Sequence, residues 1–344
     1  MSATTREGAP EDALNVLWLQ SGGCGGCSMS LLCADSSDLF ADLADAGIRL
    51  LWHPAFSEQS GRQAHEVLLA CLDGELRLDV LCLEGAVMCG PEGTGLFHVL
   101  AGTGRPMMAW VRELAAVARH TVAVGSCAAF GGVPAVGHQP GDVTGLQFEG
   151  DLAGGLLGPD YAARGGLPVI NIAGCPTHPD WILETLANLA LGELDARALD
   201  AFQRPRFYAD HLVHHGCARN EYYEFKASAE QPGDLGCLME HLGCKGTQAH
   251  ADCNLRAWNG EGSCLRGGYP CVGCTEPGFE QPSHAVWQTP KVGGIPVGLP
   301  TDMPKAWFVA LAALSKSATP RRLKENAVSD RRRLIPHVSK TEPS

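Results

Sequence analysis

The chain has 344 residues, of which 45% are hydrophobic and 19% charged, a composition typical of a globular protein with room for about two domains. Its formal charge of −12 excludes a general nucleic-acid binder, because such a protein needs a basic surface. Its 15 cysteines are too sparse for a disulfide scaffold but numerous for a protein of this size.

The N-terminal segment MSATTREGAPED has neither a Sec nor a twin-arginine pattern. The longest apolar run, Ala306 to Leu314, is too short to cross a bilayer. We therefore expect a soluble, cytoplasmic protein with no membrane span. In a reducing cytosol, clustered cysteines bind metal or do redox work more often than they form disulfides.

The first 200 residues alternate between short apolar runs and helical stretches. The runs predict buried strands at 15–20, 48–53, 80–84, 121–125 and 169–172. The stretches predict helices at 28–43, 64–72, 107–119 and 180–191. This alternation predicts an α/β fold with a doubly wound parallel sheet, in which ligands bind beyond the carboxyl ends of the strands.

Regular alternation stops after about residue 200. Gly, Pro and Cys become dense from Gly216 to Pro277, so we expect metal centres rather than a hydrophobic core to hold this segment together. The predicted parts are a flexible N-terminus at 1–12, an α/β domain at 13–200, an irregular Cys-rich domain at 201–314 and a basic tail at 315–344. Three tryptophans are expected at helix core positions: Trp110, Trp181 and Trp307.

Four cysteines follow predicted strands. Cys24 and Cys27 form CGGC after the first, Cys127 lies in GSCAAFGG after the fourth, and Cys175 lies in AGCPTHPDW after the fifth. Four thiols at one sheet edge suit a [4Fe–4S] cluster, although structural zinc uses the same number of ligands. Buried core thiols are the third interpretation. A CxxC alone also occurs in redox pairs, so the placement of all four carries the prediction.

A second group is His214, Cys217, Cys237 and Cys244. One imidazole and three thiolates can hold an iron–sulfur cluster or a zinc ion, and these residues alone do not decide between them. The spacing HxxC favours His214 as the ligand, with His215 as the alternative.

A third group has four cysteines within 22 residues and ends in CVGC: Cys253, Cys264, Cys271 and Cys274. Its spacing fits iron–sulfur or zinc equally well. Four cysteines remain: Cys33, Cys71, Cys82 and Cys89. Cys71 and Cys82 fall on a predicted helix and strand and are interpreted as core thiols, whereas Cys33 and Cys89 have no assigned role.

Glu84 ends the third predicted strand in CLEGAV. A carboxylate at this edge could be catalytic as a proton relay, or it could be a hydrogen-bonded structural acid. The sequence contains no GxxxxGK[ST], HExxH or GxSxG motif and no GxGxxG after a strand. ATP-dependent, NAD-dependent and hydrolase chemistry therefore lose support.

Taken together, these motifs resemble the small subunit of [NiFe]-hydrogenases. The CxxC after the first strand, G-[ST]-C-x-x-x-GG, GCP, HxxC and the Cys-rich domain occur in the family's order between about Val16 and Pro304. The resemblance implies a flavodoxin-like domain, an iron–sulfur domain and a row of three clusters. These clusters would relay electrons from H2 oxidation at a nickel–iron centre in a partner large subunit.

The resemblance also implies which residues hold each cluster. The proximal ligands would be Cys24, Cys27, Cys127 and Cys175, and the distal ligands would be His214, Cys217, Cys237 and Cys244. The medial ligands would be Cys253, Cys264, Cys271 and Cys274. Many members have Pro at the position of Cys264 and carry a medial [3Fe–4S] cluster, so the resemblance implies three [4Fe–4S] clusters here. Glu84 aligns with a family carboxylate near the large-subunit interface.

Within the family, NVLWLQSGGCGGCSMSLL and INIAGCPTHP look like the soluble cytoplasmic branch. The stretch HHGCARNEYYEFKASAE and the basic tail look like the H2-sensing regulatory subunit. This resemblance implies a dimer of heterodimers that signals to a histidine kinase, with the tail as docking element. The alternatives are a cytoplasmic uptake hydrogenase feeding a redox carrier, a solvated end for the tail, and a non-hydrogenase iron–sulfur or zinc module.

Overall fold

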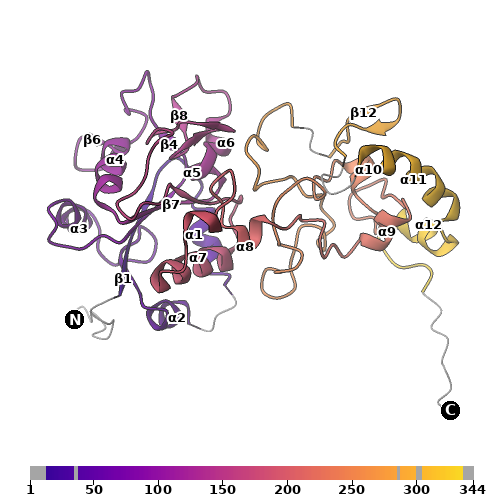
Figure 1. Cartoon of the computed structure of the whole chain (residues 1–344), viewed down its shortest axis with the longest axis horizontal. Coiled ribbons are helices and arrows are strands. Elements are labelled where there is room, and N and C mark those ends of the chain that lie inside the picture. The colour runs from indigo at the N-terminus through magenta and orange to yellow at the C-terminus, as the bar shows by residue number, and fades with distance from the viewer. Residues whose placement is uncertain (1–12, 35–37, 285–286, 300–303, 336–344) are drawn as a thin grey trace, which may run out of the picture. The chain divides into compact units, whose positions relative to one another are not determined.

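The computed structural model describes residues 13–34, 38–284, 287–299 and 304–335 (Figure 1). The predicted flexible N-terminus at 1–12 and residues 336–344 of the predicted tail lie outside these described residues. The chain forms two compact units. The first comprises Met1–Asp210 and Cys274–Gln281, and the second comprises His211–Gly273 and Pro282–Ser344.

A five-stranded sheet forms the centre of the first unit, and all of its strand pairs are parallel. Its strands are β1 (Leu14–Gln20), β2 (Ile48–Trp52), β3 (Val80–Glu84), β7 (His120–Val124) and β11 (Ile170–Ile172). Their spatial order is β11-β7-β3-β1-β2, the order of a flavodoxin-like doubly wound sheet. The predicted fold class is therefore confirmed.

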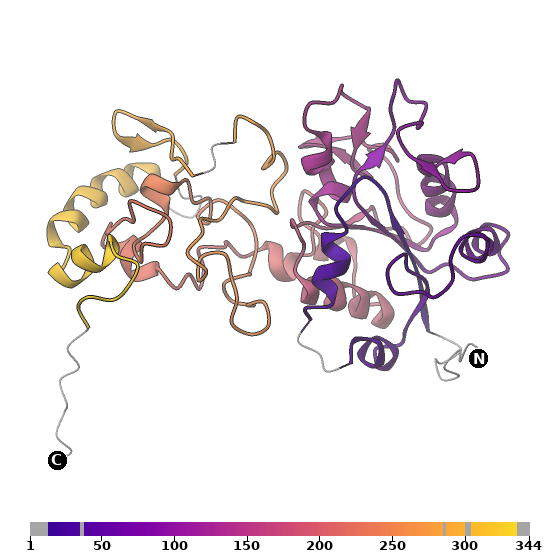
Figure 2. The same cartoon turned by 180° about the vertical axis from the view of Figure 1, so that it is seen from behind.

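Helices pack on both faces of this sheet (Figures 1 and 2). They are α1 (Gly26–Leu31), α2 (Leu39–Asp45), α3 (Arg62–Leu72), α4 (Met107–Val117) and α7 (Pro179–Leu191). Helices α3 and α4 pack together, as do α1 and α7. The main core includes Leu17 and Leu81 from the strands and Trp110 and Leu114 from α4, so the hydrophobic effect stabilises this unit.

The prediction of one helix over 28–43 is wrong, because α1 ends at Leu31 and α2 begins at Leu39. The N–H groups of Cys27 and Ser28 are bound by a carboxylate of the sheet, so α1 starts early and lies beside the strand end. The Asp38 carboxylate accepts the Ala41 N–H at 3.1 Å and caps a separate helix.

Short elements fill the connections of the first unit. The two-residue strands pair as three antiparallel ladders: β4 (Val87–Met88) with β8 (Val143–Thr144), β5 (Val99–Leu100) with β6 (Arg105–Pro106), and β9 (Phe148–Glu149) with β10 (Leu152–Ala153). The helices are α5 (Ser126–Phe130), α6 (Gly132–Ala135), η1 (Ala196–Ala198) and α8 (Arg206–Ala209).

The segment Cys274–Gln281 belongs to the first unit although it follows most of the second in sequence. Ser126 Oγ donates to the Cys274 carbonyl at 2.5 Å. Arg204, which is buried, donates to the Thr275 carbonyl at 3.0 Å and to Glu276 at 2.9 Å. These hydrogen bonds fix the cysteine segment to loops of the first unit.

The second unit is mostly irregular. Its elements are α9 (Asn220–Glu224), α10 (Met239–Leu242), β12 (Lys291–Val292), β13 (Ile295–Pro296), α11 (Lys305–Ala318) and α12 (Arg321–Ala327). Its two described hydrophobic clusters are small and have buried centres at Tyr223, Met239 and Phe308 and at Ala227, Leu323 and Ala327. Such clusters bury little apolar surface compared with the first unit's core.

The C-terminal helices depart from two predictions. The expected tail boundary at 314/315 falls inside α11, and α12 packs Leu323 against Tyr222 and Phe225. Trp110 and Trp181 are buried as expected, but the prediction for Trp307 is wrong, because 66% of it is exposed. Among the residues of α11, only Phe308 is buried. In the described part of the chain, no helix has both the length and the apolar character needed to span a membrane.

Candidate metal centres

The structure brings the first four cysteines together at the carboxyl edge of the sheet. Cys24 and Cys27 follow β1, Cys127 lies in α5 directly after β7, and Cys175 follows β11. In the order β11-β7-β3-β1, β7 lies next to β11, and one strand, β3, separates β7 from β1. The thiols are close enough to perturb one another, since Cys24 and Cys175 both raise the pKa of Cys127.

Two glycines leave room beside these thiols. Gly125 has a φ of +87°, and a Cβ there would lie 2.6 Å from Cys27 Sγ. Gly132 has a φ of +54°, and its Cβ would lie 3.1 Å from Cys127 Sγ. Only glycine adopts such backbone angles readily and leaves this space open. The two glycines therefore let the backbone approach these cysteines closely.

Burial makes three of these thiols, Cys27, Cys127 and Cys175, poor anions without a metal. It raises the pKa of Cys127 to about 12 and also raises the pKa of Cys27 and Cys175. The backbone N–H groups of Thr177 and Val133 donate hydrogen bonds to the sulfurs of Cys27 and Cys127, respectively. These hydrogen bonds lower the pKa of each thiol and so oppose the effect of burial. Metal binding would supply the missing positive charge and release the thiol protons.

The donor spacing bears on which metal group fits. Zn–S bonds of about 2.3 Å require the sulfurs of one zinc site to lie within roughly 4 Å of one another. Among the described residues, no three His, Cys, Asp or Glu side chains are grouped tightly enough to hold a single metal ion. Four thiolates are also the ligand set of a [4Fe–4S] cluster.

Glu84 stands at the end of β3, between the thiol-bearing loops, and only 3% of it is exposed. Oε1 accepts the N–H groups of Cys27 at 2.9 Å and Ser28 at 3.1 Å. Oε2 accepts from Ser28 Oγ at 2.5 Å, Gln20 Nε2 at 2.9 Å and Trp18 Nε1 at 3.3 Å. Both oxygens thus bind α1 to the sheet. The predicted proton relay at Glu84 stays a prediction.

His53 extends this network and is missed by the sequence analysis. Its Nδ1 accepts the Ala55 N–H at 3.0 Å, which leaves Nε2–H to donate to Ser28 Oγ at 3.2 Å. Burial lowers the pKa of His53 to about 4 against the opposing effect of Glu84, so the ring is neutral at pH 7. The only signal in the sequence is a histidine at the end of a buried strand.

In the second unit, four predicted ligands line one cavity: His214, Cys217, Cys237 and Cys244. The His214 ring packs against Tyr223, with the ring centres 4.3 Å apart. His215 is not part of this lining, and its Nδ1 accepts the Leu212 N–H at 3.1 Å. This geometry favours His214 over His215 as the imidazole ligand.

A buried cation lies beside these thiols. The Arg219 N–H donates to Cys217 Sγ at 3.4 Å, and its guanidinium donates to the carbonyls of Leu265 at 3.0 Å and Gly236 at 2.7 Å. Burial lowers the pKa of Arg219, whereas the neighbouring Cys217 and Cys237 raise it. Arg219 therefore places positive charge where a negatively charged cluster would lie.

The third group divides between the two units. Cys253, Cys264 and Cys271 belong to the second unit, and Cys274 belongs to the first. The Gly273 N–H donates to Cys271 Sγ at 3.3 Å, a bond that favours a thiolate. Burial raises the pKa of Cys264. The set of four ligands stays a prediction from the sequence.

The four remaining cysteines do not join these groups. Cys71, Cys82 and Cys89 are buried in the first unit, where burial raises the pKa of each thiol. Cys33 is exposed, and its Sγ lies 3.8 Å from the Met29 carbonyl. The buried three behave as apolar side chains.

Comparison with known proteins decides what these sites belong to. The family described as "NADH ubiquinone oxidoreductase, 20 Kd subunit" matches residues 24–189, and the family of the C-terminal part of the NiFe/NiFeSe hydrogenase small subunit matches residues 209–286. The F420 non-reducing hydrogenase II small subunit of Methanosarcina mazei is 34% identical over 325 residues, which cover 87% of this chain and 82% of that protein. The chain belongs to the [NiFe]-hydrogenase small-subunit family.

Further relatives agree with this assignment. The Hydrogenase-2 small chain of Escherichia coli is 31% identical over 271 residues, covering 77% of this chain and 67% of that protein. The actinobacterial-type NiFe-hydrogenase from Ralstonia eutropha H16 has a similar structure, with a TM-score of 0.71, 27% identity and 96% coverage of both chains. This small subunit is therefore the iron–sulfur, electron-transfer subunit of an H2 oxidoreductase. These relatives give the predicted sensor branch no specific support.

Proposed function

We propose that this small subunit transfers electrons from H2 oxidation, at a nickel–iron site in a partner large subunit, to a redox carrier. The observation that supports this most is the gathering of four thiols from three strand ends at one sheet edge. Iron–sulfur clusters, when bound, supply one-electron steps at fixed positions. The chain's own residues set where those steps occur and how readily each position is reduced.

We assign three [4Fe–4S] clusters to this subunit, as its ligand types allow. The proximal set is Cys24, Cys27, Cys127 and Cys175, and the distal set is His214, Cys217, Cys237 and Cys244. The medial set is Cys253, Cys264, Cys271 and Cys274. A neutral imidazole in place of one thiolate favours the reduced state at the distal position.

Residues around the ligands prepare each site. The carboxylate of Glu84 holds the N–H groups of Cys27 and Ser28 and so fixes the first turn of α1. The N–H of Arg219 donates to Cys217 Sγ, and its charge favours electron acceptance nearby. Backbone N–H groups on the sulfurs act in the same direction, because they stabilise added negative charge.

The uptake role has better support than the sensor role. The relatives described above are named as hydrogenases, the F420 non-reducing hydrogenase II and Hydrogenase-2, and neither name refers to sensing. The basic segment expected to dock a histidine kinase is folded in the second unit as far as Ala327. The cytoplasmic location and the dimer of heterodimers stay predictions of the sequence.

Anaerobic purification of the tagged chain from its host tests this proposal. We expect a nickel-containing large subunit to co-purify, about 12 iron atoms per small subunit, and H2-dependent reduction of benzyl viologen. Zinc in place of iron, or no large subunit, would overturn the proposal. A bound histidine kinase together with slow H2 turnover would replace the uptake role by the sensor role.

A matched pair of variants tests the proximal ligand set. Cys127→Ser should remove about four iron atoms and one cluster signal in electron paramagnetic resonance. Cys71→Ser changes a buried thiol that lies in the α3 core and should retain all iron. Equal iron loss in both variants would contradict the assignment of Cys127.

A further inference from the structure

The hydroxyl of Ser126 joins three chain segments that carry proposed cluster ligands. Ser126 itself directly precedes Cys127, a proposed proximal ligand. Its Oγ accepts the N–H of Gly174 at 2.9 Å, and Gly174 directly precedes Cys175, another proximal ligand. The same Oγ donates to the carbonyl of Cys274, a proposed medial ligand, at 2.5 Å. One hydroxyl, only 1% exposed, therefore connects segments of two proposed sites.

The hydrogen bonds of Ser126 lead away from its own helix. Ser126 is the first residue of α5, and serine side chains at a helix start commonly bond an N–H group of the same helix. Here the partners of Oγ lie 48 and 148 residues further along the chain. The two bonds therefore hold distant segments together, and the shape of α5 does not depend on them.

Backbone hydrogen bonds strengthen the connection between the two proximal loops. The Ser126 N–H donates to the Gly174 carbonyl at 2.9 Å, and the Gly125 N–H donates to the Ile172 carbonyl at 2.9 Å. Residues 126 and 174 are thus joined by two bonds, one through the backbone of Ser126 and one through its side chain. Cys274 is attached to a pair of loops whose spacing is already fixed.

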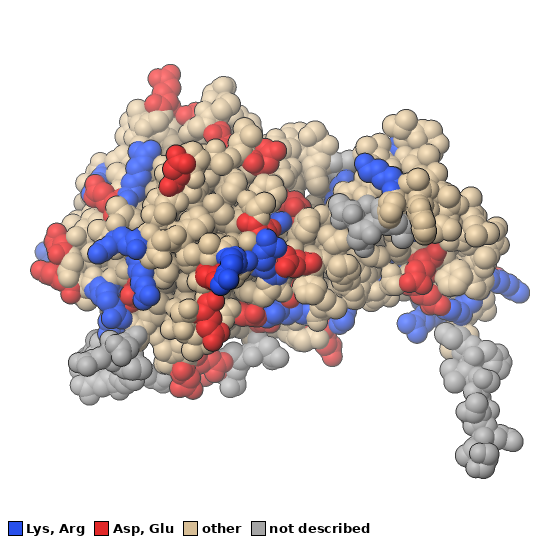
Figure 3. All heavy atoms as spheres, viewed as in Figure 1, with Lys and Arg blue, Asp and Glu red and all other residues tan. Residues whose placement is uncertain are grey.

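A buried arginine attaches the segment of Cys274 at a second place. Lys and Arg side chains are spread over the face of the chain that Figure 3 shows, whereas only 2% of Arg204 is exposed. Its guanidinium donates to the Thr275 carbonyl at 3.0 Å and pairs with Glu276 at 2.9 Å and Asp200 at 2.8 Å. A buried charge needs such partners. Arg204 therefore holds the two residues that directly follow Cys274.

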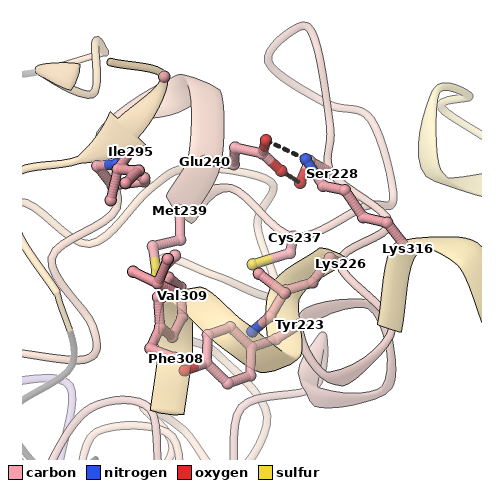
Figure 4. A pocket seen from close by; sticks show the side chains of 13 residues that line it. Tyr223, Lys226, Ser228, Cys237, Met239, Glu240, Ile295, Phe308, Val309 and Lys316 are labelled. Atoms are coloured by element: carbon pink, nitrogen blue, oxygen red, sulfur yellow. Dashed lines mark hydrogen bonds and ion pairs between the residues drawn. The ribbon is translucent and has the colours of Figure 1, made fainter. Parts of the chain in front are cut away.

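The serine beside the proposed distal ligand Cys237 makes a different connection. Ser228 and Cys237 line the same pocket (Figure 4). Ser228 Oγ donates to Glu240 at 2.6 Å, and the same carboxylate pairs with Lys316. This hydroxyl thus bonds a side chain, whereas Ser126 bonds the backbone of a cysteine. Ser228 is therefore a suitable control for the role of Ser126.

We propose that Ser126 is a positioning residue for electron transfer between the proximal and medial sites. This inference rests on the proposed function and gives a role to a residue outside the ligand sets. The protein's contribution to electron transfer is to set the positions of its redox groups, and the rate falls as their separation grows. The hydrogen bond from Ser126 to Cys274 fixes this position and links the chain at Cys127 to the chain at Cys274.

The electron balance of this step involves one electron at a time. Oxidation of each H2 at the partner subunit yields two protons and two electrons, so two transfers follow each H2. In each transfer the reduced proximal site loses one electron and the oxidised medial site gains it. No covalent bond forms or breaks, and the hydroxyl of Ser126 keeps its proton throughout.

The test compares three variants of the intact hydrogenase, purified anaerobically: Ser126→Ala, Ser126→Thr and Ser228→Ala. When the proximal and medial sites are both reduced, their unpaired electrons interact and split the electron paramagnetic resonance signals, and the splitting weakens with distance. Ser126→Ala should retain about 12 iron atoms and show a weaker splitting. In samples frozen at intervals after H2 is added, the medial signal of this variant should appear about tenfold more slowly.

The other two variants show whether the hydroxyl is responsible. Ser126→Thr keeps a hydroxyl and should restore both the splitting and the rate. Ser228→Ala should match the wild type in both, because its hydroxyl bonds Glu240 and no cysteine segment. If Ser126→Ala loses the medial iron, full iron and wild-type splitting in Ser126→Thr still support the proposal, and an equal loss in both variants overturns it.

The outcomes separate the positioning role from the proposed function. A merely structural serine would lower the unfolding temperature of Ser126→Ala and leave the splitting and the rate at wild-type values. That result would overturn the positioning role alone. A wild-type enzyme in which H2 reduces none of the clusters would contradict the proposed function itself.

Discussion

At the residue scale, Glu84 accepts three hydrogen bonds from the first turn of α1 and two from side chains of β1, and so joins α1 to the sheet. In Glu84→Gln, an NH2 group would replace one of the two carboxylate oxygens. The donors that face this position would then have no acceptor. Leaving buried donors without acceptors costs about 1–3 kcal/mol each, so we expect a loss of about 3 kcal/mol of unfolding free energy. The proximal cluster's electron paramagnetic resonance spectrum should also change, because Cys27 shifts with α1.

The control for this variant is Glu113→Gln. Glu113, on α4, forms an exposed ion pair with Arg105 of β6. Such pairs contribute about 0–1 kcal/mol to the free energy of unfolding. Thermal unfolding and the resonance spectrum of both variants should be measured on the same preparation. A Glu84→Gln variant that matches Glu113→Gln in both respects would show that Glu84 does not position Cys27.

His53 predicts a dependence of stability on pH. Its pKa in the folded chain is about 4, below the ordinary value of 6.5, because burial opposes charging. The unfolded chain therefore binds more protons in this window, and stability is lost as pH falls from 6.5 towards 4. The loss attributable to His53 should reach about 3 kcal/mol.

Thermal unfolding between pH 7 and pH 4 measures this effect. His53→Gln should flatten the profile, at the cost of a lower stability at pH 7 where the Ser28 hydrogen bond is lost. His138→Gln, at an exposed histidine, should keep the wild-type slope. Identical slopes in all three proteins would assign the pH dependence to other groups.

These two residues show where sequence reasoning stops. The strand-end cysteines could be placed because parallel strands bring their carboxyl ends to one edge. The hydrogen-bond partners of His53 and Glu84 could not be predicted, because Ser28, Gln20 and Cys27 come close to these two side chains only after the strands have paired. A buried polar residue needs a hydrogen-bond partner, but the tertiary structure determines which residue is that partner.

At the element scale, all five strands of the main sheet could be predicted to within one residue at each end. Their apolar runs are short and end in glycine or polar residues, which mark the boundaries clearly. The division of 28–43 into α1 and α2 could not be predicted, because the position of α1 depends on its hydrogen bonds to Glu84. The exposure of Trp307 could not be predicted either, since an apolar helix pattern does not reveal whether other residues of the chain pack against the helix.

Helix α12 illustrates how the C-terminal segment is attached. Leu323 is fully buried and packs with Ala327 against Tyr222 and Phe225. Leu323→Ala should cost about 3 kcal/mol through the cavity it leaves. Amide hydrogen exchange should then become faster in α12 and in residues 220–227.

The matched control is Leu314→Ala on the neighbouring helix. Leu314 is 64% exposed, so its truncation should change stability by less than about 0.5 kcal/mol. Exchange rates in α12 should stay at wild-type values in this variant. If both alanine variants behave alike, α12 is not held by the burial of Leu323.

At the scale of the whole molecule, the two units obtain stability from different sources. The first has a large core that combines strand residues such as Leu17 and Leu81 with α3 and α4. The second has only two small hydrophobic clusters in its described part, although it contains all four proposed distal ligands. Metal binding contributes folding free energy when few apolar contacts are available.

Removal of iron should therefore unfold the second unit first. After anaerobic treatment with an iron chelator and ferricyanide, we expect rapid amide exchange across residues 211–273 and slow exchange in β1, β3 and β7. Reconstitution with iron and sulfide should restore protection in the second unit together with the cluster absorbance. Cys71, which lies in the first unit's core, should stay protected from a thiol reagent throughout because α3 does not open.

The order of unfolding discriminates between two sources of stability in the second unit. If α9, α10 and the small clusters suffice, protection in residues 211–273 will survive loss of iron while the thiols become reactive. If the clusters are required, protection and iron content will fall together at every degree of depletion. Only the second pattern agrees with a segment whose ligands, His214, Cys217, Cys237 and Cys244, surround a cavity instead of filling it.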